Sequence, residues 1–535
     1  MIFNRRKKDR DHLLQSFGKL KEVNFNFNQI EKYFRGKKHT EVLQAISDKT
    51  CNDLDFEELF MFLDRTSSKV GQQYLYNRLR SVPAGSNDTK AQEDLIELLS
   101  TDSEFRVSLQ RQLGKLNSND SYYISSLFQE EHIKPPKWFF LVPILSFTTV
   151  FSLILMPFNP NLFFVLITAI VINLGLHYWN KRNLYRYTNA MPQLVRLNRV
   201  ARDLFKNKEL KKLNTRLDEA LRVLDRVKNR MLLFKFEGSL EGDFAVIFWT
   251  FLELIKSVFL IEPILLFGVL KRLDTRREEI ESVFAFVGQV DALISIASLR
   301  MGLDGYCIPE IVENRSAIVA KEAYHPLIPD CVTNSIEVGE KSILLTGSNM
   351  SGKTSFIRTI GLNTLTALTL NTCFATSFAL PRLKIFSAIR ISDDLMNDKS
   401  YYFEEVQTIK EMIGQSDNGV PNLFLLDEIF KGTNTVERIS AGKAVLSYLA
   451  KGSNMVFVST HDIELGELLE EEYQLYHFSE QVDDRSVAFD YKLKSGKLKN
   501  RNAIRILQIN DYPNEIISEA MGLSRELDAK SIQLV

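Results

Sequence analysis

The sequence has few cysteines and no net charge. Its four cysteines lie far apart and form no C-x-x-C pair, which argues against a zinc site or a disulfide framework: Cys51, Cys307, Cys331 and Cys373. The 67 lysines and arginines balance 67 aspartates and glutamates, so no overall basic field indicates nucleic-acid binding, although a local basic patch stays open. The N-terminus, MIFNRRKKDRDHLL, is charged and has no apolar segment behind it, so we expect no secretory signal.

The length and composition predict more than one domain. A chain of 535 residues that is 45% hydrophobic can form two or more domains with sizeable cores. Residues 1–50 are polar and basic, whereas residues 51–137 and 180–320 carry apolar side chains at helical spacing. Ser and Thr at residues 66–68 interrupt this pattern and can cap a new helix. We therefore expect an all-α domain in two parts, followed by a separate domain over residues 321–535.

Two long uncharged runs, residues 138–156 and 161–179, interrupt the helical sequence. Each is close to the roughly 20 residues that cross a hydrocarbon core. Tryptophans and basic residues stand at the outer ends of the pair, whereas the loop between the runs has no charge: Trp138, Trp179, Lys134, Lys137, Lys181, Arg182 and Arg186. By the positive-inside rule we expect a two-span transmembrane hairpin over residues 138–179 in the cytoplasmic membrane, with both termini cytoplasmic. A buried core hairpin is the alternative.

A third apolar stretch, residues 244–270, contains Glu253, Lys256 and Glu262. Its aromatic and aliphatic residues repeat at helical spacing, which indicates a helix with an apolar face. We expect a core helix or a helix on the membrane surface. A third span is the alternative, which the three charged side chains disfavour.

The most informative stretch is SILLTGSNMSGKT, residues 342–354, where a short apolar run precedes a fit to G-x-x-x-x-G-K-[ST] at every fixed position. The glycines let successive N–H groups point at one phosphate group, and the following helix adds its positive end. Lys353 is expected to reach the β- and γ-phosphates of a nucleotide, and the Thr354 hydroxyl to bind Mg²⁺. A chance glycine loop is the alternative. The predicted nucleotide-binding residues are Gly347, Ser348, Asn349, Met350, Ser351, Gly352, Lys353 and Thr354.

Two later strands end in side chains suited to phosphoryl chemistry. PNLFLLDE reads as a buried strand that ends in Asp427, expected to hold Mg²⁺ through water, and Glu428, expected to orient or deprotonate the attacking water. MVFVS leads to His461, which can donate a hydrogen bond to the γ-phosphate. Acidic N-cap residues and a structural histidine are the alternatives. This order of elements predicts an α/β domain with a mainly parallel sheet and ligands at its carboxyl edge.

These motifs resemble those of the MutS family of DNA mismatch repair ATPases. TGSNMSGKTSFIRTIGLNTLTAL looks like the family's phosphate loop, whose internal Asn-Met is unusual, and LLDEIFKGTNTVE resembles its Asp-Glu strand and Gly-Thr turn. AYHPLIPD, STHD and PNEIISEA extend the likeness over roughly the C-terminal 215 residues. LDRTSSKVGQQYLYNRLRSVP is similar to the start of the family's helical core and lever region. The resemblance implies an ABC-type P-loop ATPase fold, the cofactors ATP and Mg²⁺, DNA binding, and a head-to-tail homodimer in which Ser400 completes the other subunit's ATP site.

The chain departs from the family pattern in several places. Ser348 and Ser351 replace a usual proline and glycine, and Asp398 replaces the glycine ahead of Ser400. We recognise no mismatch-reading domain and no clamp domain, and the apolar hairpin lies within the helical region. We therefore predict a membrane-anchored MutS-like ATPase related to mismatch repair or recombination. A membrane-associated switch that acts on a protein partner is the alternative. A transporter is disfavoured, because transport needs polar intramembrane residues and we recognise none in the two short runs.

Overall fold

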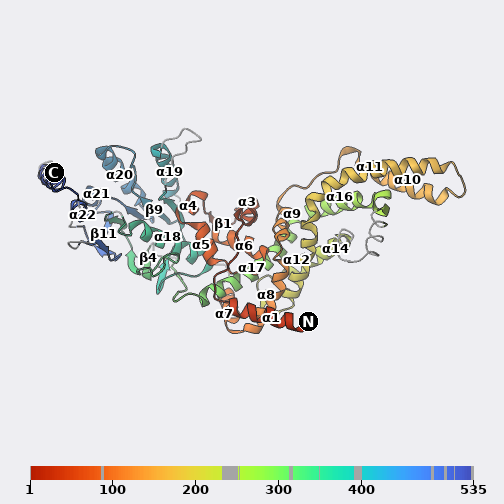
Figure 1. The fold of residues 1–535 in the computed structure, drawn as a ribbon, viewed down its shortest axis with the longest axis horizontal. Helices are drawn as coiled ribbons and strands as arrows, with labels where there is room; N and C mark the ends of the chain where they lie inside the picture. Colours follow the sequence, from red (N-terminus) through yellow and green to blue (C-terminus); the bar gives the residue numbers. More distant parts are fainter. Residues whose placement is uncertain are drawn as a thin grey trace. The chain divides into compact units, whose positions relative to one another are not determined.

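The computed structural model forms two compact units, which we call the helical unit and the α/β unit (Figure 1). The helical unit comprises residues 1–38, 63–78 and 88–302, and the α/β unit comprises residues 39–62, 79–87 and 303–535. The structure describes residues 2–85, 89–231, 251, 254–312, 317–348, 350–390, 401–417, 419–482, 487–498, 503–510 and 512–531.

The α/β unit is built on a six-stranded sheet with the order β14-β11-β6-β10-β9-β8. All strands but β14 pair in parallel. Their side chains form near-continuous apolar runs because both faces of a parallel sheet are covered by helices. The mainly parallel sheet predicted from the sequence is confirmed. The strands are β6 (Ser342–Thr346), β8 (Lys384–Ala388), β9 (Asn422–Asp427), β10 (Met455–Ser459), β11 (Tyr473–His477) and β14 (Lys494–Ser495).

Helices connect these strands and bury their apolar sides against the sheet. One core cluster joins β9 and β10 to side chains of the two helices on either side of β9 along the chain. A second sheet has the order β3-β7-β4-β5. The bounds are α18 (Lys353–Leu370), α19 (Tyr401–Ser416), α20 (Thr435–Leu449), α21 (Ile463–Leu468), α22 (Ala503–Ile509), α23 (Asn514–Ser531), β3 (Glu310–Ile311), β4 (Ile318–Ala323), β5 (Asn334–Val338), β7 (Ser377–Leu380), β12 (Glu480–Val482) and β13 (Val487–Phe489).

An early stretch of the chain, residues 39–62, belongs to the α/β unit, whereas the sequence analysis divided it between the N-terminal segment (1–50) and the helical domain (51–137). The Gln44 side chain hydrogen-bonds both backbone groups of Ile385 in β8, at 2.7 Å each. The buried Asp53 carboxylate accepts from the Ser387 hydroxyl at 2.6 Å and from the backbone N–H of Arg390 at 2.8 Å. Hydrophobic periodicity in the sequence does not predict these hydrogen bonds between distant segments. The elements are β1 (Val42–Ala45), α4 (Asp48–Asp53), α5 (Phe56–Leu63) and β2 (Ser81–Pro83).

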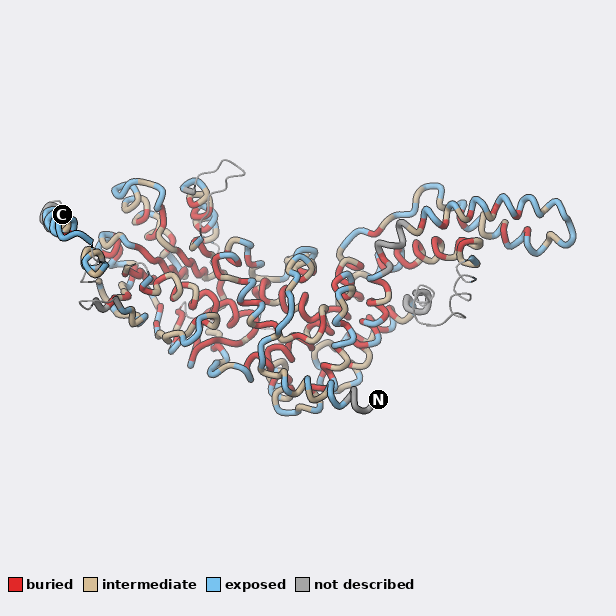
Figure 2. The backbone as a smooth tube through the Cα atoms, viewed as in Figure 1, coloured by how far each residue is buried: buried red, intermediate tan, exposed pale blue. Residues whose placement is uncertain are grey.

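The helical unit is organised around α17 (Arg277–Met301), whose C-terminal half is buried on all sides (Figure 2). Length and composition would allow this helix to cross a membrane, but 83% of its most apolar window is buried within the protein. It is therefore a core helix. Around it lie α1 (Ile2–Ser16), α2 (Phe27–Ile30), α3 (Lys32–Gly36), α6 (Lys69–Arg80), α7 (Thr89–Thr101), α8 (Ser103–Leu113), α9 (Ser126–Gln129), α12 (Ala190–Phe205), α13 (Lys208–Lys211) and α14 (Leu217–Met231).

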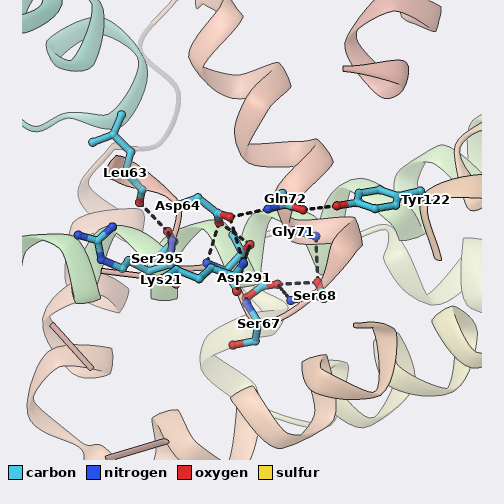
Figure 3. A network of polar contacts seen from close by, with 12 residues as sticks. Lys21, Leu63, Asp64, Ser67, Ser68, Gly71, Gln72, Tyr122, Asp291 and Ser295 are labelled. Carbon is cyan, nitrogen blue, oxygen red and sulfur yellow. Dashed lines mark hydrogen bonds and ion pairs between the residues drawn. The ribbon is translucent and has the colours of Figure 1, made fainter. Parts of the chain in front are cut away.

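A buried polar network fixes the turn between α5 and α6 to α17 (Figure 3). The Asp291 carboxylate of α17 accepts from the backbone N–H groups of Ser67 and Ser68, each at 2.8 Å, and from the Ser68 hydroxyl. The Ser68 hydroxyl in turn accepts from the N–H of Gly71 at 2.9 Å, as expected of a helix cap. A Cβ atom at Gly71 would lie 2.1 Å from Asp291 Oδ2, so only glycine fits. The predicted break at residues 66–68 is confirmed.

The two uncharged runs form the predicted helical hairpin. It consists of a short 3₁₀ turn (Lys137–Phe140), α10 (Leu141–Leu155) and α11 (Leu162–Thr188), with α16 (Ile261–Asp274) packed beside both helices (Figure 1). Only 17% and 22% of the apolar windows of the two hairpin helices are buried, as the exposed tube in Figure 2 shows. The rings of Trp138 and Trp179 lie together, with centroids 5.0 Å apart. Both helices are long and apolar enough to cross a membrane.

Candidate functional site

The phosphate loop follows the buried strand β6 and leads into α18. Gly347 has a φ of +149°, and a Cβ atom there would lie 2.7 Å from the carbonyl oxygen of Phe478. Gly352 has a φ of +104°, which side chains rarely tolerate, and it precedes the first residue of α18. Both glycines are therefore needed for the loop to curl around a cradle in front of the helix N-terminus.

The predicted phosphate-binding lysine is held inside this loop. Lys353 is buried, and its ammonium donates to the carbonyl oxygens of Gly347 and Ser348, each at 2.8 Å. Burial lowers the pKa of Lys353, while the carboxylates of Glu428 and Asp427 favour its charged form. The loop thus holds the Lys353 ammonium beside the cradle. Phosphate oxygens can replace the two carbonyl oxygens as its hydrogen-bond acceptors.

The two serines that depart from the family pattern have different environments. The Ser348 hydroxyl donates to Glu480 Oε2 in β12 at 2.8 Å, which fixes the loop from outside. Ser351 Oγ is buried and has no hydrogen-bond partner among the described residues. Met350 is 82% exposed with a φ of +70°, so its side chain leaves the loop. Asn349 lies outside the described residues.

The predicted Mg²⁺ ligands are brought together by parallel strand register. Asp427 ends β9 opposite Ser459 at the end of β10. Thr354, in the first turn of α18, donates from its hydroxyl to Asp427 Oδ2 at 2.8 Å, and the Ser459 hydroxyl donates to the other carboxylate oxygen. A hydroxyl and a carboxylate are the ligands that Mg²⁺ uses beside nucleotide phosphates. Among the described residues, no three His, Cys, Asp or Glu side chains form a cluster for another kind of metal site.

The predicted catalytic pair also meets at this edge of the sheet. His461 Nε2 lies 2.6 Å from Glu428 Oε1, and Lys431 pairs with the other carboxylate oxygen. The hydrogen bond from His461 is the main reason that the pKa of Glu428 falls to about 2, and Lys431 lowers it further. Glu428 has a φ of +52°, an unusual conformation that directs its side chain away from the line of β9. Such strain in a non-glycine residue is typical of functional sites.

A cavity of about 530 Å³ opens beside the loop, a size typical of small-molecule sites. Its lining includes Lys353, Thr354 and Glu428 together with residues of the AYHPLIPD segment, Ile328 to Asp330 among them. Tyr491 also lines the cavity, and its ring lies 3.2 Å from a Cβ position at Gly352. Asn334 holds Tyr491 in place by donating to its backbone carbonyl at 2.9 Å. The lining therefore combines apolar and polar groups around the phosphate cradle.

The structure adds residues that the sequence reasoning did not single out. Ser459 directly precedes the Thr-His-Asp motif, so its place at the strand end was open to prediction. Lys431 lies within the LLDEIFKGTNTVE motif, but its side chain was given no role there. Glu480 and Tyr491 are far from the phosphate loop in the sequence, and only the fold brings them to the site. Ser400 lies outside the described residues, and α19 begins at Tyr401, directly after it. Its role stays a prediction.

A further carboxylate lies behind the phosphate loop. Asp55 pairs with Arg358 of α18 at 3.2 Å and with Arg390, after β8, at 2.6 Å. Asp55 has a φ of +50°, so this pairing is maintained in an unfavourable backbone conformation. The carboxylate thereby connects the helix of the phosphate loop to the residue that leads toward Ser400.

This geometry defines the α/β unit as a P-loop nucleotide-binding domain of the ATPase type. A phosphate cradle alone binds a nucleotide, whereas paired carboxylates at the ends of the next strand also position metal and water. The residues present therefore suit a nucleoside triphosphate with Mg²⁺.

Comparison with known proteins finds relatives of part of the chain. Residues 343–528 match the model of MutS domain V. The DNA mismatch repair protein MutS of Aquifex pyrophilus is 29% identical over 272 residues, which are 49% of this chain and 31% of that protein. The DNA mismatch repair protein MSH3 of Saccharomyces cerevisiae (strain YJM789) is 29% identical over 280 residues, 49% of this chain and 27% of that protein. MutS of Fusobacterium nucleatum subsp. nucleatum is 26% identical over 273 residues, 45% of this chain and 30% of that protein.

Residues 343–528 of this chain are therefore similar to the domain of MutS proteins that carries their ATPase site. The chain spans less than a third of the length of the curated relatives that it matches.

Proposed function

We propose that this protein is a membrane-anchored ATPase that binds ATP with Mg²⁺ and uses hydrolysis to switch between two states. The proposal rests on one observation: two pairs of side chains in contact lie at the same edge of the sheet. Thr354 contacts Asp427 at 2.8 Å, and His461 contacts Glu428 at 2.6 Å. The sheet thus presents a metal-binding pair and a water-positioning pair beside one phosphate cradle.

Each residue has a distinct part in hydrolysis. The ammonium of Lys353, now on the loop carbonyls, would bind phosphate oxygens of the nucleotide, and the backbone N–H groups of the loop would bind the same phosphate. Thr354 and Asp427 would hold Mg²⁺, whose positive charge would offset the negative charge of the phosphates. Glu428 orients the attacking water. Because a pKa of about 2 makes Glu428 a weak base, positioning rather than proton removal is its main contribution.

A homodimer with shared sites follows from the resemblance to the family. Ser400 directly precedes α19 in the sequence, and a serine ahead of a helix can offer a hydroxyl to a γ-phosphate that arrives from the other subunit. His461 and Ser400 would then act on the same nucleotide from different chains. This arrangement makes hydrolysis depend on pairing of the two subunits.

The membrane anchor is the hairpin of α10 and α11. Its outward-facing side chains are large and apolar: Phe147, Ile154, Phe158, Phe164 and Val171 are between 62% and 84% exposed. Exposed apolar surface on this scale is costly in water, whereas a hydrocarbon core covers it without loss. The adjacent rings of Trp138 and Trp179 suit the interface at the cytoplasmic side.

DNA is the proposed partner of the ATPase, because the matched relatives are DNA mismatch repair proteins. The test is ATP hydrolysis by the detergent-purified protein with no DNA, duplex, mismatched or branched DNA, at low and high salt. We expect DNA to change the rate, with an effect that weakens steeply as salt rises. A Lys353→Ala chain controls for contaminating ATPases. Hydrolysis with no response to any DNA would exclude this partner and favour the alternative of a switch acting on a protein.

A further inference from the structure

A third apolar segment, residues 254–274, packs against the hairpin through polar contacts that a surface helix does not need. Residues 254–258 are helical, the chain breaks at residues 259–260, and α16 follows. The break is marked by Leu260, which has a φ of +52°. A break in a helix leaves backbone carbonyls without their usual partners.

Side chains of the hairpin bind the carbonyls at this break. The Ser146 hydroxyl of α10 donates to the carbonyl of Phe259 at 2.7 Å. The amide of Asn173 in α11 donates to the carbonyl of Val258 at 2.7 Å and to Thr149 Oγ1 at 2.9 Å. Asn173 and Thr149 are fully buried. Irregular backbone within a bilayer is tolerated only where protein groups satisfy it in this way.

The contacts lie well inside the proposed hydrocarbon region. Ser146 is eight residues beyond Trp138, and Asn173 is six residues before Trp179. At about 1.5 Å per residue, both lie roughly 10 Å deeper than the tryptophan pair. A hydrocarbon core is about 30 Å thick, so the break reaches about a third of the way across.

Charged groups nearer the tryptophans are paired within the same bundle. Glu262 in the first turn of α16 lies 3.7 Å from His177 Nδ1 and 3.6 Å from Lys256 Nζ. The side chains of His177 and Glu262 are almost fully buried, and that of Lys256 is 13% exposed. Ionisable groups at membrane depth are found facing the interior of a bundle and paired with one another. Two of the three charges that argued against a membrane position, Lys256 and Glu262, are therefore compatible with one, while Glu253 lies outside the described residues.

The segment then returns to the side on which the hairpin began. The ring of Phe267 packs on Phe139, next to Trp138, with centroids 4.6 Å apart. At the end of α16, Asp274 contacts His132 Nδ1 at 2.9 Å, ahead of the hairpin in the chain. Beyond Asp274 the chain enters α17, the core helix of the helical unit.

We propose that residues 254–274 form a re-entrant membrane element, which dips beside the hairpin and returns to the cytoplasmic side. The inference rests on the proposed membrane position of the hairpin. For residues 254–270 it replaces the expectation of a core or membrane-surface helix over residues 244–270; residues 244–250, 252 and 253 lie outside the described residues. It also corrects the view that the hairpin lacks intramembrane polar residues, since Asn173 and His177 are such residues. These groups bind protein partners, so their role is to dock the third element.

The test places spin labels on single cysteines in a chain whose two partly exposed cysteines, Cys307 and Cys331, are changed to serine. Leu254→Cys probes the segment, Phe147→Cys the hairpin and Leu20→Cys a polar surface; all three side chains are more than half exposed. The protein is reconstituted in phosphatidylcholine–phosphatidylglycerol vesicles. Accessibility to lipid-soluble oxygen and to a water-soluble nickel complex is then compared. We expect labels at residues 254 and 147 to contact oxygen, and the label at residue 20 to contact nickel.

The outcomes separate the two proposals. Lipid contact at residue 147 with water contact at residue 254 overturns the re-entrant element and leaves the anchor intact. Water contact at residue 147 overturns the anchor itself. A second arm adds Asn173→Leu, which should at least double the mobility of the label at residue 254 because the amide donor is lost. Thr168→Leu, on the exposed side of α11, is the matched control. Unchanged mobility in Asn173→Leu would refute docking through this hydrogen bond.

Discussion

His461 Nε2 contacts Glu428 Oε1 at 2.6 Å, so the histidine predicted to sense the γ-phosphate also holds the carboxylate predicted to position water. We expect His461→Ala to lower single-turnover hydrolysis by about 10-fold to 100-fold, because Glu428 loses the group that orients it. The affinity for ATP should change less than about threefold. His477→Ala is the matched control, since this histidine ends β11 of the same sheet and contacts the carbonyl of Gly496 instead. Equal losses in both variants would contradict the role of His461.

Substitutions of Lys353 and Glu428 are expected to impair different steps, namely ATP binding and ATP hydrolysis. Lys353→Ala should largely abolish ATP binding, because its ammonium neutralises phosphate charge in the bound ground state. Glu428→Gln should keep the affinity for ATP and stop turnover, because only the positioned water is affected. Equilibrium binding of a fluorescent ATP analogue and steady-state hydrolysis measure the two effects. A similar loss of affinity in both variants would refute this division.

Asp55 is expected to influence hydrolysis without touching the nucleotide. Asp55→Asn removes the carboxylate charge that forms one ion pair with Arg358 of α18 and another with Arg390. We expect hydrolysis to fall about fivefold or more while ATP affinity stays near that of the unaltered protein, since the cradle itself keeps its contacts. Asp417→Asn is the control, since this carboxylate of the same unit accepts a hydrogen bond from the Tyr448 hydroxyl. A large loss of ATP affinity in Asp55→Asn would instead indicate damage to the cradle.

Asp291 is expected to make the helical unit less stable as the pH rises from about 4 to about 6. Burial raises its pKa to about 6, although donors from Ser67 and Ser68 and the charge of Lys21 favour the ionised form, and Asp64 opposes it. The pKa of Asp291 in the folded protein lies above its unfolded value near 3.9, so protonation of this carboxyl favours the folded state. This contribution to the free energy of unfolding is complete below about pH 4 and is lost as the pH rises through about 6. The difference is at most about 3 kcal/mol.

The measurement is thermal unfolding at pH 5 and pH 7.5. Asp291→Asn should unfold at a lower temperature at both pH values, because Asn cannot accept all three hydrogen bonds. It should also show less difference between the two pH values than the unaltered protein. Asp203→Asn, on the surface of α12, controls for charge removal. The same pH dependence in Asp291→Asn and the unaltered protein would contradict the assignment.

Ser400 is expected to act on the other subunit's nucleotide. Homodimers of Ser400→Ala and of Lys353→Ala should both be inactive. Mixing them should restore hydrolysis in one of the two sites of a mixed dimer, because that site receives the intact lysine and the intact serine. Tag pull-down verifies the mixed dimers. Activity no greater than the sum of the separate variants would leave Ser400 as a helix cap, worth about 1 kcal/mol to α19.

The sequence by itself determined the local features of this protein. The phosphate loop, the strand ending in Asp427 and Glu428, and the strand before His461 were all predicted, because buried parallel strands are short apolar runs and functional groups follow their carboxyl ends. The helical hairpin was equally clear, since an apolar run of that length has few other conformations.

Only the tertiary structure decided which distant groups meet. Asp53 and Asp55 join the P-loop domain from far upstream, Glu480 supports Ser348, and Asn173 binds the carbonyl of Val258. Such contacts depend on hydrogen bonds and ion pairs between segments that are far apart in the chain. Hydrophobic periodicity reports which face of an element is buried, but it carries no information about the partner that covers that face.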